Sequence, residues 1–303
     1  MHTRDHESAN TILDKRKLQA LGVLLPVQLS GMSFFSGRHP LGRAGEGMRF
    51  LRTRPFESGH DNPRDIDKFS PPDEFWINEW EAESQASVLL CADVSGSMAF
   101  GPKAALRNLS LLQLTYSLWR AGDRVRAVLF SQGKRETFAE RNLKSQLEKL
   151  MTRLSFHNVL PGQDVIDMLA EHASRKGSTR DDLIFVVSDF CPVKDESGLD
   201  QAAQWRTLQR AMSGDIVPVI VSFELATDQR GSIRLWDAER RQHRMTLITP
   251  SRIRRINAEE AKRVAGIERL FRKLVVDYLV LRREQDVYPE LARLARWRRR
   301  CRT

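Results

Sequence analysis

Three oxygen-bearing side chains stand two residues apart at the end of an apolar run. Residues 88–92 have the length and composition of a buried strand, and Asp93, Ser95 and Ser97 follow them directly. Gly96 lies between the two serines and allows the backbone to turn sharply. One carboxylate and two hydroxyls are hard oxygen ligands, which suit Mg²⁺ better than a soft metal. The alternative interpretation is a strand followed by a Ser-rich turn that binds nothing.

A second carboxylate stands at a comparable position later in the chain. Asp189 directly follows the apolar residues 183–188, which also have the composition of a buried strand. In open α/β sheets, ligands bind at the carboxyl ends of the strands. If the two strands are neighbours, Asp93, Ser95, Ser97 and Asp189 converge there, and waters could complete a six-coordinate Mg²⁺ site. Alternatively, Asp189 only caps its strand or the turn that follows.

The sequence contains no other arrangement that predicts catalysis. It has neither a G-x-x-x-x-G-K-[ST] phosphate loop nor a G-x-G-x-x-G after a strand. Ser97 lacks the G-x-S-x-G context of a hydrolase nucleophile. The seven histidines show no metal-ligand spacing, and the second aspartate of an aspartyl-phosphate phosphatase is missing after Asp93. We therefore expect a protein that is not an enzyme.

The elements that must position these residues alternate between strands and helices. Besides the run at 88–92, strands are expected at 124–130, 135–139, 182–188, 216–222 and 278–281, and a hairpin at 232–249. Helices are expected at 103–121, 143–154, 165–175, 201–212, 258–274 and 288–300. The nearly all-apolar strands indicate burial on both faces. This pattern predicts an α/β fold with a doubly wound, mostly parallel sheet covered by helices on both faces.

The first 86 residues have a different organisation. Residues 1–30 predict an N-terminal helical segment with one short helix at 12–21, and the Gly-rich residues 31–47 predict a loop. Residues 48–56 and 75–83 alternate between apolar and polar side chains and predict two strands. We therefore expect three parts: a helical segment at 1–30, a β-rich segment at 31–86, and a main α/β domain at 87–303.

The bulk composition is that of a soluble globular protein. Of the 303 residues, 41% are hydrophobic and 29% charged, and the formal net charge is +10. Three scattered cysteines are too few for a disulfide framework. The N-terminus lacks the layout of a signal peptide, and no apolar run approaches the ~18 residues of a membrane span. We expect a cytoplasmic protein without a membrane span.

The positive charge is concentrated near the C-terminus. From Arg282 onward there are eight arginines against three acidic residues. Such a surplus is compatible with nucleic acid, anionic lipid or an acidic protein as partner, and equally with a solvated face that aids solubility.

The motif and its upstream context together resemble a known family. The sequence DVSGSM at 93–98 resembles the metal-ion-dependent adhesion site (MIDAS) of von Willebrand factor A domains. Upstream lie a Gly-rich lead, a strand with basic residues, a turn and an acidic strand, and this order is similar to the signature of the DUF58 family. The resemblance covers roughly residues 36–285. The signature turn is carried by Gly59, Asp61, Arg64, Ile66 and Asp67.

The resemblance implies a function and partners. Family members are typically encoded beside MoxR-type AAA+ ATPases and are thought to act with them in chaperone-like maturation of other proteins. The size of the chain and its lack of a membrane hairpin look similar to the methanol-dehydrogenase-maturation (MxaS-like) subgroup, which is implicated in metal insertion. A domain of this kind holds Mg²⁺ and leaves one coordination position for a carboxylate of the partner.

The chain departs from the family pattern in two places. Metal-competent A domains usually place a Thr in the loop between the first motif and the later Asp, whereas here residues 160–165 read LPGQDV. Gln163 or Asp164 stands where the Thr ligand would fall, offering a neutral or a charged oxygen. In the signature turn, Lys68 replaces the usual Trp.

These observations lead to one main interpretation and two alternatives. We expect a non-enzymatic, metal-dependent adaptor that binds a MoxR-like ATPase and a client protein through an acidic side chain. The first alternative is a nucleic-acid-binding protein that uses the arginines of 232–255 and 282–302. The second is a hydrolase whose metal activates water, although the sequence offers it no evident general base.

Overall fold

The computed structural model describes residues 39–44, 50–132, 134–155, 163–174, 181–191, 201–212, 214–228, 230–237 and 242–300. The chain divides into two compact units, one of residues 29–86 and one of residues 1–28 together with 87–303. The helix expected at 12–21 lies outside the described residues.

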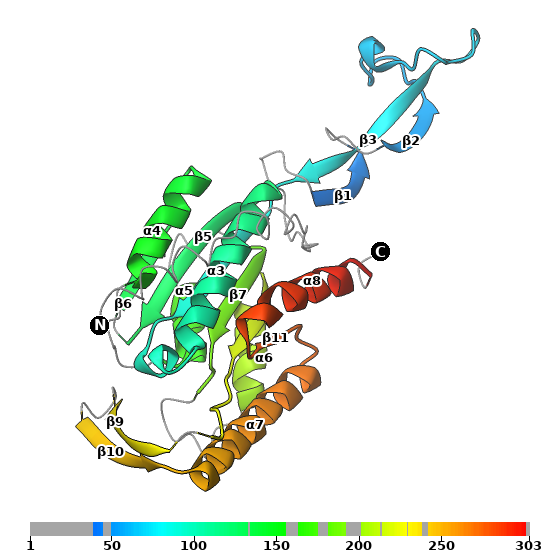
Figure 1. The fold of residues 1–303 in the computed structure, drawn as a ribbon. Helices are drawn as coiled ribbons and strands as arrows, with labels where there is room; N and C mark the ends of the chain where they lie inside the picture. The colour runs from blue at the N-terminus through cyan, green and yellow to red at the C-terminus, as the bar shows by residue number, and fades with distance from the viewer. Residues whose placement is uncertain are drawn as a thin grey trace. The chain divides into compact units, whose positions relative to one another are not determined.

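A six-stranded sheet forms the centre of the larger unit (Figure 1). Its strands, in spatial order, are β11 (Leu279–Leu281), β8 (Asp215–Val221), β7 (Leu183–Ser188), β4 (Ser87–Asp93), β5 (Arg124–Ser131) and β6 (Lys134–Phe138). The edge strand β6 is antiparallel to β5, and all other pairs are parallel. Strands β4 and β7 are neighbours, with Ala92 opposite Val187. Residues 88–93 of β4 are buried, as a central strand covered on both faces requires.

Helices cover both faces of this sheet. They are α3 (Lys103–Arg120), α4 (Leu143–Ser155), α5 (Val165–Ser174), α6 (Gln201–Ala211), α7 (Pro250–Lys273) and α8 (Glu284–Arg300). Leu89 and Cys91 of β4 share a hydrophobic core with side chains of α5, α6 and α7. Helix α3 packs against β4 and β5 and also contacts α4 and α8. The predicted doubly wound, mostly parallel α/β fold is confirmed.

Two helices begin earlier than the sequence pattern indicates. Helix α7 starts at Pro250, because Pro is well accommodated in the first turn and the side chain of Thr249 accepts a hydrogen bond from Arg252 N. Helix α8 starts at Glu284 and contains Pro289. A proline after the first turn normally breaks a helix, yet here the helix continues through Pro289, so the predicted start at 288 is four residues late.

The expected hairpin is present as a separate two-stranded sheet. Strand β9 (Gly231–Asp237) pairs with β10 (Gln242–Ile248) in antiparallel register, with Gly231 opposite Ile248. Among the described residues, none of the helices is long and apolar enough to cross a bilayer.

The smaller unit is a three-stranded antiparallel sheet in the order β1-β3-β2. Strands β2 (Phe50–Pro55) and β3 (Trp76–Ser84) match the two predicted strands. Strand β1 (His39–Ala44) lies within the segment 31–47 that was predicted to be a loop, and that part of the prediction is wrong. An edge strand is held by main-chain hydrogen bonds to its neighbour, which need no alternation of apolar side chains.

Candidate functional site

The candidate site lies at the carboxyl ends of the neighbouring strands β4 and β7, where the strand order of the sheet reverses. After β4 the chain passes through α3 to β5 on one side, whereas β7 lies on the other side of β4. In open α/β sheets such a switch point is where ligands bind, and we call the region around Asp93, Ser95, Ser97 and Asp189 the crevice. Asp93 is the last residue of β4, and Asp189 follows the last residue of β7. Both are buried, with 4% and 2% of their surface exposed.

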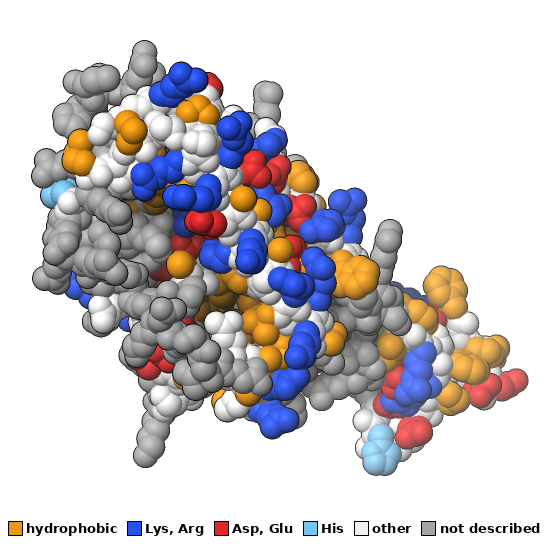
Figure 2. Space-filling model, turned by 90° about the horizontal axis from the view of Figure 1, so that it is seen from below, with side chains coloured by type: hydrophobic (Ala, Val, Ile, Leu, Met, Phe, Trp, Pro, Cys, Tyr) orange, Lys and Arg blue, Asp and Glu red, His pale blue; other side chains and the backbone are white. Residues whose placement is uncertain are grey.

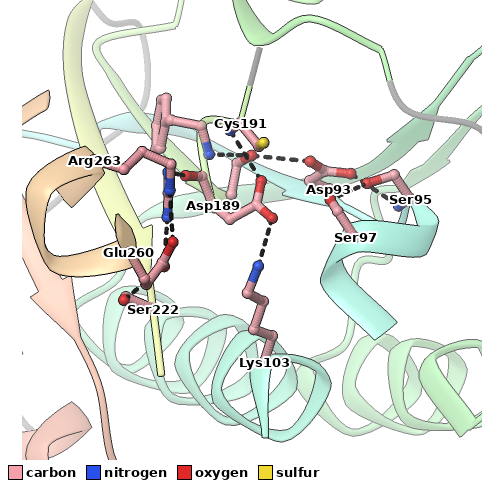
Figure 3. A network of polar contacts seen from close by, with 11 residues as sticks. Asp93, Ser95, Ser97, Lys103, Asp189, Cys191, Ser222, Glu260 and Arg263 are labelled. Carbon is pink, nitrogen blue, oxygen red and sulfur yellow. Dashed lines mark hydrogen bonds and ion pairs between the residues drawn. The ribbon is translucent and has the colours of Figure 1, made fainter. Parts of the chain in front are cut away.

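The turn after β4 directs three oxygen-bearing side chains into one place (Figure 3). The Ser95 amide donates a hydrogen bond to Asp93 Oδ1 at 2.8 Å, which holds the backbone in a tight turn. A short 3-10 helix, η2 (Gly96–Ala99), follows and brings Ser97 Oγ to 3.2 Å from Ser95 Oγ. Ser95 is buried and Ser97 is exposed. The set of oxygens therefore opens to solvent at Ser97.

Asp93 is held in an environment that disfavours its charge. Burial, and then the negative charge of Asp189, raise the pKa of Asp93 to about 6. Hydrogen bonds from Ser95 and from Ser188 Oγ, which lies 2.9 Å from Asp93 Oδ2, act in the opposite direction. A cation placed beside Asp93 would therefore gain more from it than from an ordinary surface carboxylate.

A strained loop positions Asp189. Phe190 has φ 52°, in the left-handed region that a bulky residue rarely occupies. Its ring packs against Trp205 and Phe271, with centroid distances of 6.4 and 5.7 Å, and this packing stabilises the strained conformation. The Cys191 amide donates to Asp189 Oδ1 at 3.1 Å. The carboxylate is thereby fixed toward the crevice.

The crevice also contains charged residues that the sequence patterns did not single out. Lys103 Nζ, at the first residue of α3, donates to Asp189 Oδ2 at 2.8 Å (Figure 3). Arg263 of α7 donates to the main-chain carbonyl of Asp189 and pairs with Glu260 at 2.6 Å. Glu260 in turn accepts a hydrogen bond from Ser222 Oγ at 2.8 Å. No local sequence motif predicts that these residues lie at the site, because the fold brings them together from elements far apart in the sequence.

These cations change the electrostatics of Asp189. Burial alone would raise its pKa, but the charge and hydrogen bond of Lys103 hold the pKa below the usual value of an aspartate. On the other side, Arg107 of α3 donates to the Asp93 carbonyl at 3.3 Å, and burial lowers the pKa of Arg107 to about 10. Both Asp189 and Arg107 are therefore charged at neutral pH.

The two residues in the position of the usual Thr make local contacts. Asp164 Oδ1 accepts a hydrogen bond from Ile166 N at 2.8 Å, at the start of α5. Gln163 Nε2 donates to Glu171 at 3.1 Å. These contacts tie Asp164 to the first turn of α5 and Gln163 to Glu171 further along the same helix.

The chemistry of Asp93, Ser95 and Ser97 fits a hard divalent cation. The two hydroxyl oxygens lie close together, the carboxylate is buried beside them, and one member of the set faces solvent. Within the described part of the chain, no three His, Cys, Asp or Glu side chains form a metal-binding group. A cation here would therefore depend on two carboxylates, the serine hydroxyls and water.

The signature turn of the smaller unit is held by ion pairs of its own. Arg54 of β2 donates to Asp61 at 2.6 Å and to Glu79 of β3 at 2.6 Å. The hydrogen bond from Arg54 lowers the pKa of Asp61 to about 2. Gly59 has φ 88°, which favours glycine, and Asp67 Oδ1 accepts from Phe69 N at 3.1 Å. Arg64 lies in the 3-10 helix η1 (Pro63–Asp65). The turn is thus fastened to β2 and β3.

Comparison with known proteins identifies one matching family. The family described as "Protein of unknown function DUF58" matches residues 52–265, which is more than half of the chain. No protein with a curated description matches significantly.

Several solved structures show a distant likeness. BatB from Bacteroides thetaiotaomicron is 11% identical, with 70% of this chain and 99% of that chain covered and a TM-score of 0.40. An aerotolerance-related membrane protein from Bacteroides fragilis is 14% identical, with coverage of 70% and 99% and a TM-score of 0.40. A von Willebrand factor type A protein from Catenulispora acidiphila is 10% identical, with coverage of 71% and 43% and a TM-score of 0.37. At these identities and scores, the likenesses carry no information on function.

Proposed function

Since the chain belongs to the DUF58 family, we propose that it is a non-catalytic adaptor, which recognises a partner protein through the crevice between β4 and β7. One observation carries this proposal. Asp93, Ser95 and Ser97 bring three oxygens together at the switch point of the sheet, next to the buried Asp189.

The adaptor would hold Mg²⁺ through Asp93, Ser95, Ser97 and Asp189. A bound divalent cation supplies a concentrated positive charge to which an Asp or Glu of a partner can bind in place of water. The exposed Ser97 marks the side from which such a carboxylate would approach. The protein itself supplies the rigid arrangement, because the β4 turn and the Phe190 loop are fixed by hydrogen bonds and aromatic packing.

The proposed partner is a MoxR-type AAA+ ATPase, acting together with a client protein whose maturation or activation it assists. Metal insertion into a dehydrogenase is one such activation, as the resemblance to the methanol-dehydrogenase subgroup implies. The described residues of the crevice lack a free general base directed at solvent: Asp93 accepts two hydrogen bonds, and Asp189 is paired with Lys103. This favours binding over hydrolysis.

The basic surface offers less support for nucleic-acid binding. Figure 2 shows Lys and Arg side chains on one face, with Asp and Glu side chains between several of them. Arg255 and Arg293 lie within ion-pair distance of acidic residues on their own helices. Arg298 is buried and bonded to Asp215 and Asp277, so a phosphate cannot reach it. Among the described arginines, these therefore do not offer a phosphate an unopposed positive charge.

A binding assay tests the proposal. Wild-type protein and Asp93→Ala would each be immobilised and tested for capture of a MoxR-type AAA+ ATPase, in Mg²⁺ and in chelator. Calorimetry would follow Mg²⁺ binding to the same two proteins. We expect capture by the wild type in Mg²⁺ and a loss of capture with Asp93→Ala or chelator. Asp228→Ala, which removes an exposed carboxylate, serves as the control. Equal capture under all conditions would contradict metal-dependent recognition.

A further inference from the structure

The crevice already contains a cation that belongs to the protein. Lys103 Nζ lies 2.8 Å from Asp189 Oδ2, and both residues are buried, with 7% and 2% of their surface exposed. The ammonium group also lies 5.3 Å from the ring centroid of Phe223. It therefore occupies a fixed place beside one of the two carboxylates proposed as metal ligands.

The position of Lys103 is unfavourable without this pairing. Lys103 is the first residue of α3, and a positive charge at the N-terminus of a helix opposes the helix dipole. A buried ammonium also loses its hydration. Both effects would direct the side chain toward solvent, so its inward orientation shows that the ion pair with Asp189 outweighs them. Lys103 is held in the crevice by the carboxylate.

The charges around the crevice are balanced in number. Of the residues that the structure describes, three carboxylates and three cations lie in the contact network around Asp93 and Asp189. The carboxylates are Asp93, Asp189 and Glu260, and the cations are Lys103, Arg107 and Arg263. A divalent cation added to this set would leave two positive charges in excess within a largely buried region. Such an excess is costly at low dielectric, so a metal would have to displace one of the resident cations.

Lys103 is the resident cation that a metal would displace. Arg107 and Arg263 donate to main-chain carbonyls, and Arg263 is also paired with Glu260. Lys103 alone among these three donates to the carboxylate of a proposed metal ligand. It also has a flexible side chain at the start of a helix, whereas the Arg guanidinium groups are each held by two partners.

We infer that Lys103 is a built-in competitor for the divalent cation, and that its pairing with Asp189 sets the metal affinity of the site low. This inference rests on the proposed function, because it takes Asp189 to be a metal ligand. Binding of the cation breaks the Lys103–Asp189 ion pair and moves the ammonium group away from the carboxylate. The chain thereby remains folded and charge-balanced when divalent ions are scarce.

Calorimetric titration of Mg²⁺ into the full chain tests the inference. Lys103→Met removes the charge and keeps most of the volume, and we expect it to tighten Mg²⁺ binding at least about tenfold. Lys103→Gln serves as a second variant. Its amide can still donate a hydrogen bond to Asp189, and this bond favours the folded state. We expect Lys103→Gln to tighten binding as well, to a smaller extent. Lys262→Met, at an exposed position of α7, is the control for net charge and should leave the affinity unchanged.

Thermal unfolding gives an independent readout. In chelator, Lys103→Met leaves the buried Asp189 without its ammonium partner, so the unfolding midpoint of this variant should fall below that of the wild type. Mg²⁺ should restore this midpoint, whereas it should shift the wild type little. Adding Asp93→Ala to Lys103→Met should abolish the restoration if the metal binds in the crevice.

The outcomes separate this inference from the proposed function. Equal Mg²⁺ affinity of the wild type and both Lys103 variants would overturn the competitor role and leave the metal site intact. Absence of binding in all three would overturn both. Binding by the variants alone would support the competitor role but contradict metal-dependent recognition by the wild-type chain.

Discussion

Replacing Asp93 with Asn should stabilise the metal-free protein at neutral pH. In the folded state, burial and the charge of Asp189 raise the pKa of Asp93 from 3.8 to about 6. Because the folded state binds the proton more tightly than the unfolded state, stability falls as pH rises between these two values. A shift of this size corresponds to about 3 kcal/mol above pH 6. Asn has no charge and escapes this cost.

A lost hydrogen bond reduces the stability that Asp93→Asn gains. The carbonyl oxygen of Asn can still accept from Ser95 N, but its amide group would face Ser188 Oγ, which donates to Asp93 in the wild type. Losing that bond costs about 1 kcal/mol, so the net gain at pH 7.5 should be about 2 kcal/mol. At pH 5, where Asp93 is mostly protonated in the folded state, the charge contribution should be about half as large.

Urea unfolding followed by circular dichroism, in chelator at pH 7.5 and pH 5, measures both values. Asp189→Asn provides the matched contrast, because Lys103 holds the pKa of Asp189 below its usual value. A carboxylate with a lowered pKa stabilises the protein above its unfolded pKa, so this variant should be less stable at pH 7.5. An Asp93→Asn protein less stable than the wild type at pH 7.5, or a difference independent of pH, would refute this electrostatic account of the crevice.

Three other changes test separate parts of the structure. Ser97→Ala should alter unfolding by no more than about 0.5 kcal/mol, because Ser97 is exposed, yet weaken Mg²⁺ binding in calorimetry. An unchanged affinity would remove Ser97 from the ligand set. Gly214→Ala should cost about 1–3 kcal/mol in urea unfolding, because its Cβ would lie 2.1 Å from the Asp181 carbonyl. Gly266→Ala should instead stabilise α7 by up to about 1 kcal/mol, because no atom lies within 4 Å of the added Cβ. Equal changes in stability at the two glycines would contradict the close approach of the Asp181 backbone to Gly214. Arg298→Met should lower stability by about 2 kcal/mol and speed proteolysis within α8, because it leaves Asp215 and Asp277 without the arginine that bridges them. Wild-type stability in this variant would show that the bridge does not fasten α8.

The sheet and its helices were predictable because their signals are local. Apolar runs such as 183–188 have the length and β-branched content typical of strands covered on both faces, and their alternation with amphipathic segments leaves few possible topologies. Strand β1 was missed because main-chain pairing with β3 holds it and no side-chain pattern reveals it. The early start of α7 depends on a cap at Thr249, a signal weaker than the apolar periodicity used to place the helix.

The candidate site was predictable only in part, for the same physical reason. Asp93, Ser95 and Ser97 lie within five residues, and a strand end is visible in the sequence. Lys103 reaches the crevice from the start of α3, and Arg263 reaches it from the middle of α7. Whether they meet Asp189 depends on which strands are neighbours in the sheet. Even a correct topology does not determine whether a lysine near a helix start points inward. The inward orientation of Lys103 depends on its ion pair with the carboxylate of Asp189.

The family match covers part of the structure described above. It covers the signature turn, the crevice and most of α7, and ends at residue 265. Helix α8 and its bridge from Arg298 to Asp215 and Asp277 lie partly or wholly beyond it. The crevice therefore belongs to the matched region, whereas the basic C-terminal helix does not.

Crystals soaked in Mn²⁺ test the central claim most directly, because anomalous scattering locates the cation independently of any binding model. Wild-type and Lys103→Met crystals should be soaked side by side, with Asp93→Ala as the control. We predict an anomalous peak among Asp93, Ser95 and Ser97, stronger in Lys103→Met than in the wild type and missing in Asp93→Ala. Well-diffracting crystals of the wild type and Lys103→Met with no peak in this crevice would contradict the claim that it is a divalent-cation site.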